Sequence, residues 1–488
     1  MTDSEQPPLW SKLSRPFDPN WTTQHGGMCH VLTEVIAELE GQENRERKRK
    51  PSALDNYLTC IKAIVLDLFR AKSAWPEHAV GLPAGRTFIS DARKSRYVPN
   101  FLSADGFLQA LQGLEDARHI TTTGQFKPPR AGRFSETRRY RLSEALFQRL
   151  QAAGGTIVDL DRNPSAEGIV LKDEAKQRSD YASVPFTEEA SARLARINAM
   201  LSAYWYDLEL SDAELAEKGV ALGREELNAK PGDKEYRAID LTARTLHRVF
   251  NNGSWDQGGR FYGGWWQNMP KALRPYILID GKRTIEIDYS GIHPAMLLAE
   301  AGCEIPDDPY GRCLDGSTEE GLRDCVKRTF NALLNASSVE GLQPINEFSE
   351  ALTGRTWPEF KQFIVASYPE FSDKFGTGEG LRLQRKDSDL AEDIMLLCAE
   401  RHYPCLPIHD SFIVHRGYDT EVIAAMQEIF SSKYNAKGKV KFPLEQPSYP
   451  NSDQHSIPMN AEALLGPGYE QRLQAWRNRR LRKAEIKA

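Results

Sequence analysis

The sequence has no long hydrophobic run and few cysteines. No stretch of about 18 apolar residues occurs, and the N-terminal segment MTDSEQPPLWSKL is polar and contains prolines, so we expect neither a transmembrane helix nor a secretory signal. The seven cysteines are scattered, odd in number and without a CxxC pair, which argues against a disulfide framework and a zinc site. We therefore expect a cytoplasmic protein without a membrane partner.

Neither sign of charge dominates. Lys and Arg total 63 and Asp and Glu 68, so the formal net charge is -5. With 40% hydrophobic and 27% charged residues, the 488-residue chain can bury a sizeable core and form about three domains. A slightly acidic average argues against nucleic-acid binding. The positive charge is nevertheless concentrated in patches at 45–50, 127–141 and 472–487.

The N-terminal part reads as an irregular arm followed by a compact unit. The arm ends in the charge run RERKRK, for which a solvated linker and a segment that follows nucleic acid both stay open. Apolar spacing predicts helices over Asp55–Lys72 and, after Ser103 as N-cap, over Ala104–Ala117. A strand at His119–Thr122, a Gly-, Pro- and Arg-rich segment and a return strand at Arg139–Leu142 complete a winged-helix-like layout. Such modules bind DNA or dock proteins.

The middle of the chain predicts helices joined by polar connections. The helical stretches cover Glu188–Leu210, Asp212–Lys218 and Arg237–Phe250. Asp159 and Asp161 could ligate a metal, but no third acidic residue stands nearby, so we interpret them as a solvated turn. At the other end of the chain, residues 468–488 predict a basic helix, either a solvated tail or a phosphate-contacting appendage.

Two short segments place an aspartate at the end of a strand. In TIEIDYSGIHP, alternation puts Glu286 and Asp288 on one face of a strand, and Pro294 opens a short helix, so Asp288 lies where strand turns into helix. In CLPIHDSFIVH, two apolar runs flank a tight hairpin with Asp410 at its tip. Each aspartate alone could be an ordinary capping or turn residue.

A third segment, RDCVKRTFNALLN, predicts a helix with a polar stripe. Arg323, Lys327, Asn331 and Asn335 follow at intervals of four, opposite an apolar face. Two cations followed by two amides suit a triphosphate and then a base or sugar. Together, two rigid carboxylates could hold two Mg²⁺ ions roughly 4 Å apart for in-line phosphoryl displacement. The combination predicts nucleotidyl transfer.

These segments resemble the motifs of the single-subunit polymerase superfamily, which comprises family A DNA polymerases and phage-type RNA polymerases. DYSGIHPAMLLAE resembles motif A, RDCVKRTFNALLN motif B and LPIHDSFIV motif C. Gly259-Arg260 with QNMP at 267–270 is similar to the family's GR…QN-x-P segment. Order and spacing agree over roughly residues 244–418.

The resemblance implies a role for each matching residue. Asp288, Asp410 and the Tyr289 backbone carbonyl would hold two Mg²⁺ ions, with Mn²⁺ as an alternative. Lys327 would join the two aspartates as a catalytic residue that protonates the departing pyrophosphate. The residues expected to bind the nucleotide are Arg323, Lys327, Tyr289, His293, Asn331 and Asn335. The residues expected along the primer–template path are Arg260, Gln267, Asn268, Gln384 and His409.

Several positions depart from the family pattern. His293 stands where DNA polymerases of the family usually have a glutamate that excludes the ribose 2′-hydroxyl, Asn331 and Asn335 stand where aromatic residues are usual, and the hairpin reads HDS, as in phage-type RNA polymerases. We expect a DNA-dependent DNA polymerase without proofreading, acting on a DNA primer–template and nucleoside triphosphates. An RNA polymerase or primase is the first alternative, and a non-catalytic DNA-binding replication or regulatory protein is the second.

The expected fold is α+β, a palm with a fingers helix preceded by a mainly helical region. In chain order we expect an irregular basic arm (1–50), a winged-helix-like module (51–150), a helical connection that could form a thumb (151–250), a palm and fingers core (251–450) and a tail with a basic helix (451–488). The oligomeric state is left open.

Overall fold

The computed structural model combines helices with several sheets, which confirms the α+β class. It describes residues 14–43, 47–74, 79–83, 85–123, 138–209, 239–314, 316–317, 319–441 and 467–487. The basic segment 124–137 and the helix expected at Asp212–Lys218 lie outside these residues. None of the described helices is long and apolar enough to cross a membrane.

The N-terminal unit packs helices against a small sheet. The strands, in spatial order, are β1 (Ser14–Pro16), β3 (Ala79–Leu82), β5 (Arg138–Leu142) and β4 (Ile120–Thr122). The helices are α2 (Gly26–Gln42), α3 (Pro51–Ala74), α4 (Arg86–Ala92), α5 (Ala104–Asp116) and α6 (Glu144–Ala152). Ser103 caps α5 as expected, because its hydroxyl accepts from the Gly106 amide at 3.3 Å.

The expectation of an irregular arm over residues 1–50 is wrong, because the described part of this segment contains a helix. Residues 26–42 form α2, which His25 caps by accepting from the Met28 amide. Met28, Val31, Leu32, Val35 and Leu39 line its buried face. These residues recur at helical spacing and form one apolar stripe. Burial of this stripe against the rest of the unit stabilises the helix.

A second four-stranded sheet follows, in the order β11 (Ser254–Tyr262), β10 (His247–Asn251), β7 (Ile169–Lys172) and β8 (Arg178–Ser179). The helix expected at Arg237–Phe250 is therefore wrong, because its last residues form β10. Asn252 and Gly253 both have positive φ values, 54° and 64°, and close a two-residue β10–β11 turn. Asn-Gly in that position is a strong hairpin signal. The helix expected at Glu188–Leu210 is shorter, α7 (Pro185–Ser202), and is followed by a strand.

The third sheet is the scaffold of the site. Its strands, in spatial order, are β14 (Cys405–Ile408), β15 (Ser411–His415), β13 (Lys282–Tyr289), β12 (Ile277–Ile279) and β9 (Tyr206–Leu208), and β16 (Val440–Lys441) also pairs with β13. Helices α9 (Ile292–Glu300), α13 (Gly380–Glu400) and α14 (Asp419–Tyr434) accompany it. Short 3-10 turns at Trp265–Asn268 (η2) and Lys271–Tyr276 (η3) lead into β12.

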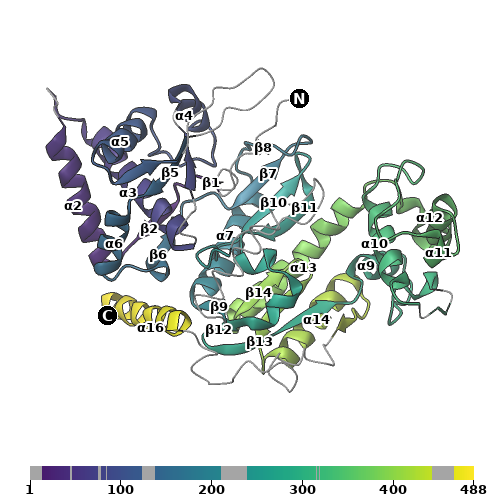
Figure 1. Ribbon diagram of the computed structural model, residues 1–488. Coiled ribbons are helices and arrows are strands. Elements are labelled where there is room, and N and C mark those ends of the chain that lie inside the picture. The colour runs from purple at the N-terminus through teal and green to yellow at the C-terminus, as the bar shows by residue number, and fades with distance from the viewer. Residues whose placement is uncertain are drawn as a thin grey trace.

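A lobe with little sheet stands beside this scaffold. It holds α10 (Leu322–Asn335), α11 (Glu350–Thr353), α12 (Trp357–Ala366) and the 3-10 turns η4 (Gly311–Cys313) and η5 (Pro369–Lys374). In Figure 1 the lobe lies on the right, and the long helix α13 runs from it back to the sheets.

Two hydrophobic cores divide the described chain near residue 159. One core includes side chains from Trp21 to Leu160 and the other side chains from Val158 to Trp476. A two-stranded sheet of β2 (Trp21–Thr23) and β6 (Leu160–Arg162), with the turn η1 (Ile157–Asp159), marks the junction. The predicted C-terminal helix is confirmed as α16 (Pro467–Lys487), and its Trp476 belongs to the second core.

Candidate active site

The third sheet brings the two expected aspartates together. Strands β13 and β15 are antiparallel, with Asp288 opposite Ser411, the residue that follows Asp410. Burial and then the charge of Asp410 raise the pKa of Asp288 to about 7. Burial also raises the pKa of Asp410, and the charge of Asp387 adds to this effect. Among the described residues, no cation lies within ion-pair distance of either carboxylate, so both are available to a ligand.

The hairpin that carries Asp410 is held from the neighbouring strand. His409 adopts a left-handed backbone conformation (φ 60°) at the first turn position. The Ser411 hydroxyl donates to Glu286 Oε1 at 2.7 Å, and Arg274 Nη1 approaches the same oxygen at 2.8 Å. Glu286 therefore fixes the hairpin, whereas Asp288, two residues on along the same strand face, is left for the site.

Helix α10 presents its cations toward this pair. Lys327 is exposed, and its charge lowers the pKa of Asp288, opposing the effect of burial. Arg323 is engaged: its Nε donates to Asp308 Oδ2 at 2.6 Å and its Nη2 to Asp308 Oδ1 at 2.9 Å. The planar guanidinium thus makes with a carboxylate the two-pronged contact that it also makes with phosphate.

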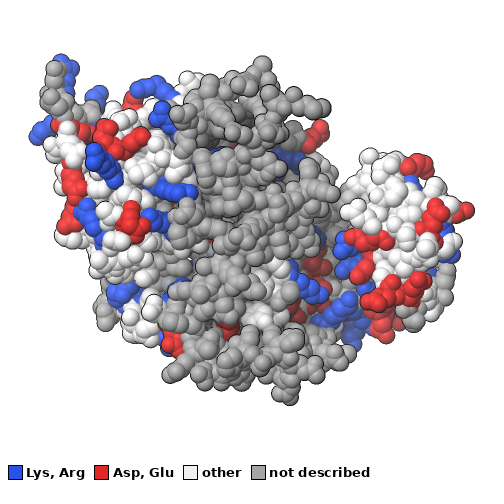
Figure 2. Space-filling view, viewed as in Figure 1, with Lys and Arg blue, Asp and Glu red and all other residues white. Residues whose placement is uncertain are grey.

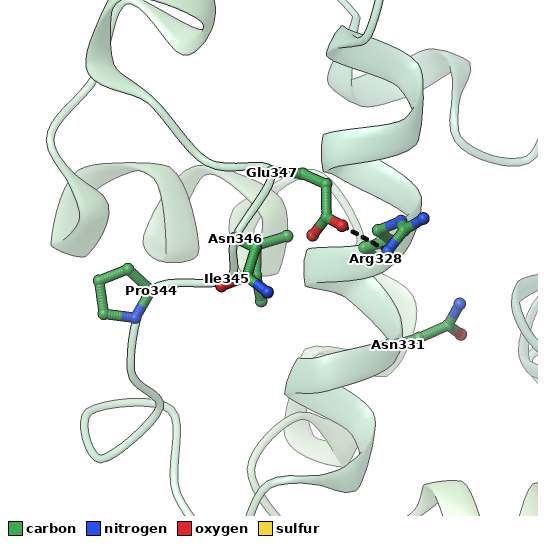
Figure 3. A pocket seen from close by; sticks show the side chains of 6 residues that line it. All are labelled: Arg328, Asn331, Pro344, Ile345, Asn346 and Glu347. Atoms are coloured by element: carbon green, nitrogen blue, oxygen red, sulfur yellow. Dashed lines mark hydrogen bonds and ion pairs between the residues drawn. The ribbon is translucent and has the colours of Figure 1, made fainter. Parts of the chain in front are cut away.

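The two amides of the stripe differ in their surroundings. Asn335 Nδ2 donates to the Asn331 carbonyl at 2.7 Å, so it folds back onto its own helix. Tyr310 is buried, which raises the pKa of its hydroxyl, and the neighbouring Asn331 side chain acts in the opposite direction. Asn331 also borders a pocket of about 430 Å³ beside α10, where Arg328 and Glu347 form an ion pair (Figure 3).

His293 is anchored to helix α13. Its Nε2 lies 2.8 Å from Asp387 Oδ2, and the guanidinium of Arg260 grips the same carboxylate. Asp387 is 3% exposed, so its charge is buried and shared between these two partners. In this way Arg260, expected on the primer–template path, and His293, expected at the sugar, belong to one cluster next to Asp410.

The remaining residues of the expected nucleic-acid path differ in their exposure and in their contacts. The Gln267 amide donates to the carbonyls of Phe261 (2.9 Å) and Pro407 (3.2 Å), so it braces the hairpin from within. Asn268 is exposed, and Gln384 is half-buried one turn before Asp387 on α13. Burial lowers the pKa of His409 to about 4, and its ring meets that of Tyr262 edge-on at 5.7 Å.

Tyr289 faces away from the aspartates. Its hydroxyl donates to the Met426 carbonyl at 2.7 Å, and its ring packs on Phe430 below the sheet. Only its backbone carbonyl could reach a ligand on the other face. Within the described part of the chain, no group of three or more His, Cys, Asp and Glu side chains is arranged to hold a metal ion.

Four residues of this region were not expected from the sequence: Asp308, Tyr310, Asp387 and Lys441. For Asp308 and Tyr310 the sequence offers a local signal, the DDPY segment at 307–310 between the motif A-like and motif B-like segments. Asp387 and Lys441 carry no local signal, since each is defined by a partner far away in the chain.

The basic helix α16 is occupied by ion pairs. Arg479 contacts Asp161 and the Val158 carbonyl, Arg482 Nη2 lies 3.0 Å from Asp159, and Arg472 Nε lies 2.7 Å from Asp207. The interpretation of residues 159 and 161 as a solvated turn is therefore wrong, because both hold arginines of α16. Those arginines are correspondingly less available to phosphates.

The N-terminal unit offers little positive charge on α5. Its exposed residues are Asp105, Gln109, Gln112 and Asp116. Arg138 is exposed at the start of β5 and Arg139 half-buried beside it, which are the described part of the expected basic segment.

No family model matches the chain, and no curated protein matches it either.

Proposed function

We propose that this protein is a template-directed nucleotidyltransferase, most closely a DNA-dependent DNA polymerase without proofreading. One observation carries the proposal: Asp288 and Asp410, 122 positions apart in sequence, meet on neighbouring strands opposite a helix that presents Lys327 and Arg323. Paired carboxylates facing a cationic helix are what transfer of a nucleotide from its triphosphate requires.

The residues present fit a divalent-cation site. Asp288 and Asp410 are half-buried, and the charge of Asp410 raises the pKa of Asp288, an electrostatic cost that a cation between the two carboxylates would relieve. Asp288 and Asp410 would supply carboxylate oxygens and Tyr289 its carbonyl, the hard donors that Mg²⁺ prefers. Bound there, Mg²⁺ or Mn²⁺ would activate the attacking 3′-hydroxyl and neutralise charge on the transferring phosphate.

The protein's own side chains would position the reactants. Lys327 and Arg323 would bind the triphosphate, with Lys327 placed to donate a proton to the departing pyrophosphate. Arg260, which is held on Asp387, and His409 of the hairpin would hold the primer terminus. In the reaction the 3′-oxygen bonds to the α-phosphorus, the α–β phosphoanhydride bond breaks and pyrophosphate leaves.

We assign the third sheet as a palm, the α10 lobe as fingers and the N-terminal unit as a winged-helix-like module. The order α3, β3, α4, α5, β4, β5, with spatial strand order β3-β5-β4, supports the last assignment. The exposed side chains of α5 are acidic or amides, so this helix is poorly suited to contact DNA. The exposed Arg138 at the start of β5 is better suited to do so.

An RNA polymerase or primase is the second candidate. The observation that favours it is His293, held on Asp387 at the position where a glutamate would exclude a ribose. The two candidates differ in the sugar they accept.

Primer extension with the full chain tests the proposal. We expect incorporation with Mg²⁺ or Mn²⁺, abolished in Asp410→Asn and retained in Glu428→Gln, a matched change at an exposed carboxylate of α14. Running dNTPs and NTPs in parallel separates the two candidates. If neither set is incorporated while DNA is still bound, the protein is a non-catalytic DNA-binding factor.

A further inference from the structure

Strand β16 places a lysine beside the first aspartate. β16 pairs antiparallel with β13 in a register that sets Lys441 opposite Asp288. Directly opposed residues of an antiparallel pair project from the same face, with Cβ atoms about 5 Å apart. Lys441 therefore projects on the face that carries Asp288, on the side of β13 away from the Asp410 hairpin.

The electrostatic neighbours of Lys441 come from three separate elements. Partial desolvation lowers its pKa, and the charges of Arg323 and Lys327 on α10 lower it further. Asp288 on β13 and Asp308 in the loop before α10 act in the opposite direction. Basic and acidic side chains are mixed at the hollow between the α10 lobe and the rest of the molecule (Figure 2). Lys441 lies within electrostatic range of both α10 cations.

Asp308 partly neutralises this cationic space. It holds Arg323 by two hydrogen bonds and accepts a third from the Tyr310 amide at 3.1 Å. The preceding residue, Asp307, is tied to Lys439 of the segment entering β16, with Nζ 2.7 Å from Oδ1. The loop and β16 are therefore fastened together, which sets Lys441 at a defined place relative to α10.

We propose that Lys441 is a third phosphate-binding cation, so that β16 and α10 form two walls of one triphosphate site. A nucleoside triphosphate carries several negative charges, and one of the two α10 cations is already paired with Asp308, so a further cation beside the metal ions would improve the charge balance. Lys441 supplies that charge from the palm side. This inference rests on the proposed function and adds a residue to it.

A purely structural alternative is that Lys441 only offsets the charge of Asp288. In that case its removal would alter stability without distinguishing phosphate ligands. The two roles differ in one measurable respect: a phosphate-binding lysine discriminates by the number of phosphates on the ligand.

Equilibrium binding of a fluorescent adenosine triphosphate and the corresponding monophosphate to the full chain tests the inference. We expect Lys441→Met to weaken triphosphate binding by roughly 10-fold or more, as loss of a charged hydrogen bond does, and monophosphate binding by less than about threefold. Lys441→Arg should restore most of the triphosphate affinity. Lys437→Met, at an exposed lysine four positions earlier, should bind like the wild type.

The outcomes separate this inference from the proposed function. Triphosphate binding that depends on Lys441 without primer extension would support the site and overturn the polymerase. Primer extension with equal triphosphate affinity in wild type and Lys441→Met would support the polymerase and overturn the role of Lys441. A wild-type chain that binds no triphosphate would overturn both. Lys441→Gln provides a polar variant of similar length should the methionine protein fail to fold.

Discussion

The imidazole of His293 and the carboxylate of Asp387 are joined across 94 positions of sequence, with 2.8 Å between Nε2 and Oδ2. His293 lies in the first turn of the helix that follows Asp288, and Asp387 lies on the helix that precedes the Asp410 hairpin. The contact therefore links the two halves of the proposed palm beside the aspartates. It also fixes the ring that stands where the nucleotide sugar would lie.

This contact determines which substitution probes sugar selection. His293→Glu, which the family pattern suggests, would place a second carboxylate against Asp387 and confound selectivity with repulsion. We expect His293→Ala to change the ratio of kcat/KM for NTPs to that for dNTPs by about 10-fold, upward if the imidazole excludes the 2′-hydroxyl and downward if it binds this hydroxyl. Steady-state kinetics on one primer–template would measure the ratio. An unchanged ratio would remove His293 from sugar selection.

The raised pKa of Asp288 predicts a stability that falls with pH when no metal is bound. Between an unfolded pKa near 3.8 and the folded value of about 7, the folded state binds the extra proton, so the free energy of unfolding decreases as pH rises through this window. We expect Asp288→Asn to be more stable than the wild type by about 2 kcal/mol at pH 8, and by less at pH 5. Urea unfolding in a chelator would test this. A difference independent of pH would contradict it.

Divalent cations should offset the loss of stability that ionisation of Asp288 causes. We expect saturating Mg²⁺ to raise the Tm of the wild type, since a ligand present at 100 times its Kd stabilises the folded state by about 2.7 kcal/mol. Asp410→Asn should lose most of this shift, whereas Glu428→Gln should keep it. Equal shifts in all three proteins would place the cation elsewhere.

Helix α16 should contribute strongly to stability through one arginine. Arg479 is 6% exposed, and its guanidinium contacts Asp161 and the Val158 carbonyl. We expect Arg479→Ala to lower the free energy of unfolding by about 2 kcal/mol, because it leaves the Val158 carbonyl without its arginine donor and Asp161 with Lys483 alone. Arg477→Ala, at an exposed arginine of the same helix, should change it by less than about 0.5 kcal/mol. Chemical unfolding of the two variants would decide, and comparable losses would show that α16 is not held by this contact.

Local sequence rules anticipated the elements that carry the aspartates. Alternation identified the strand ending at Asp288, and two apolar runs around His409 and Asp410 identified the hairpin, because both patterns are set within a few residues. Helix α2 and strand β10 also left local signals, in the apolar spacing after Met28 and in Asn252-Gly253. The sequence therefore contains a local signal for each of these two elements.

The residues that contact the site residues could not be predicted from local sequence patterns. The bond from Asp387 to His293, the grip of Asp308 on Arg323 and the position of Lys441 opposite Asp288 depend on how distant segments meet. No periodicity encodes such a meeting, and one sequence offers no covariation to reveal it. The charges of α16 show the same limit, since a basic helix looks alike whether it faces phosphate or carboxylate.

The ion pairs of α16 have a consequence for the order of synthesis. Asp159, Asp161 and Asp207 emerge from the ribosome more than 260 residues before the arginines that hold them. Until those arginines follow, Asp159 and Asp161 at the junction of the two cores and Asp207 in β9 lack these counter-charges. We therefore expect the N-terminal core to fold early during translation and the junction to close last.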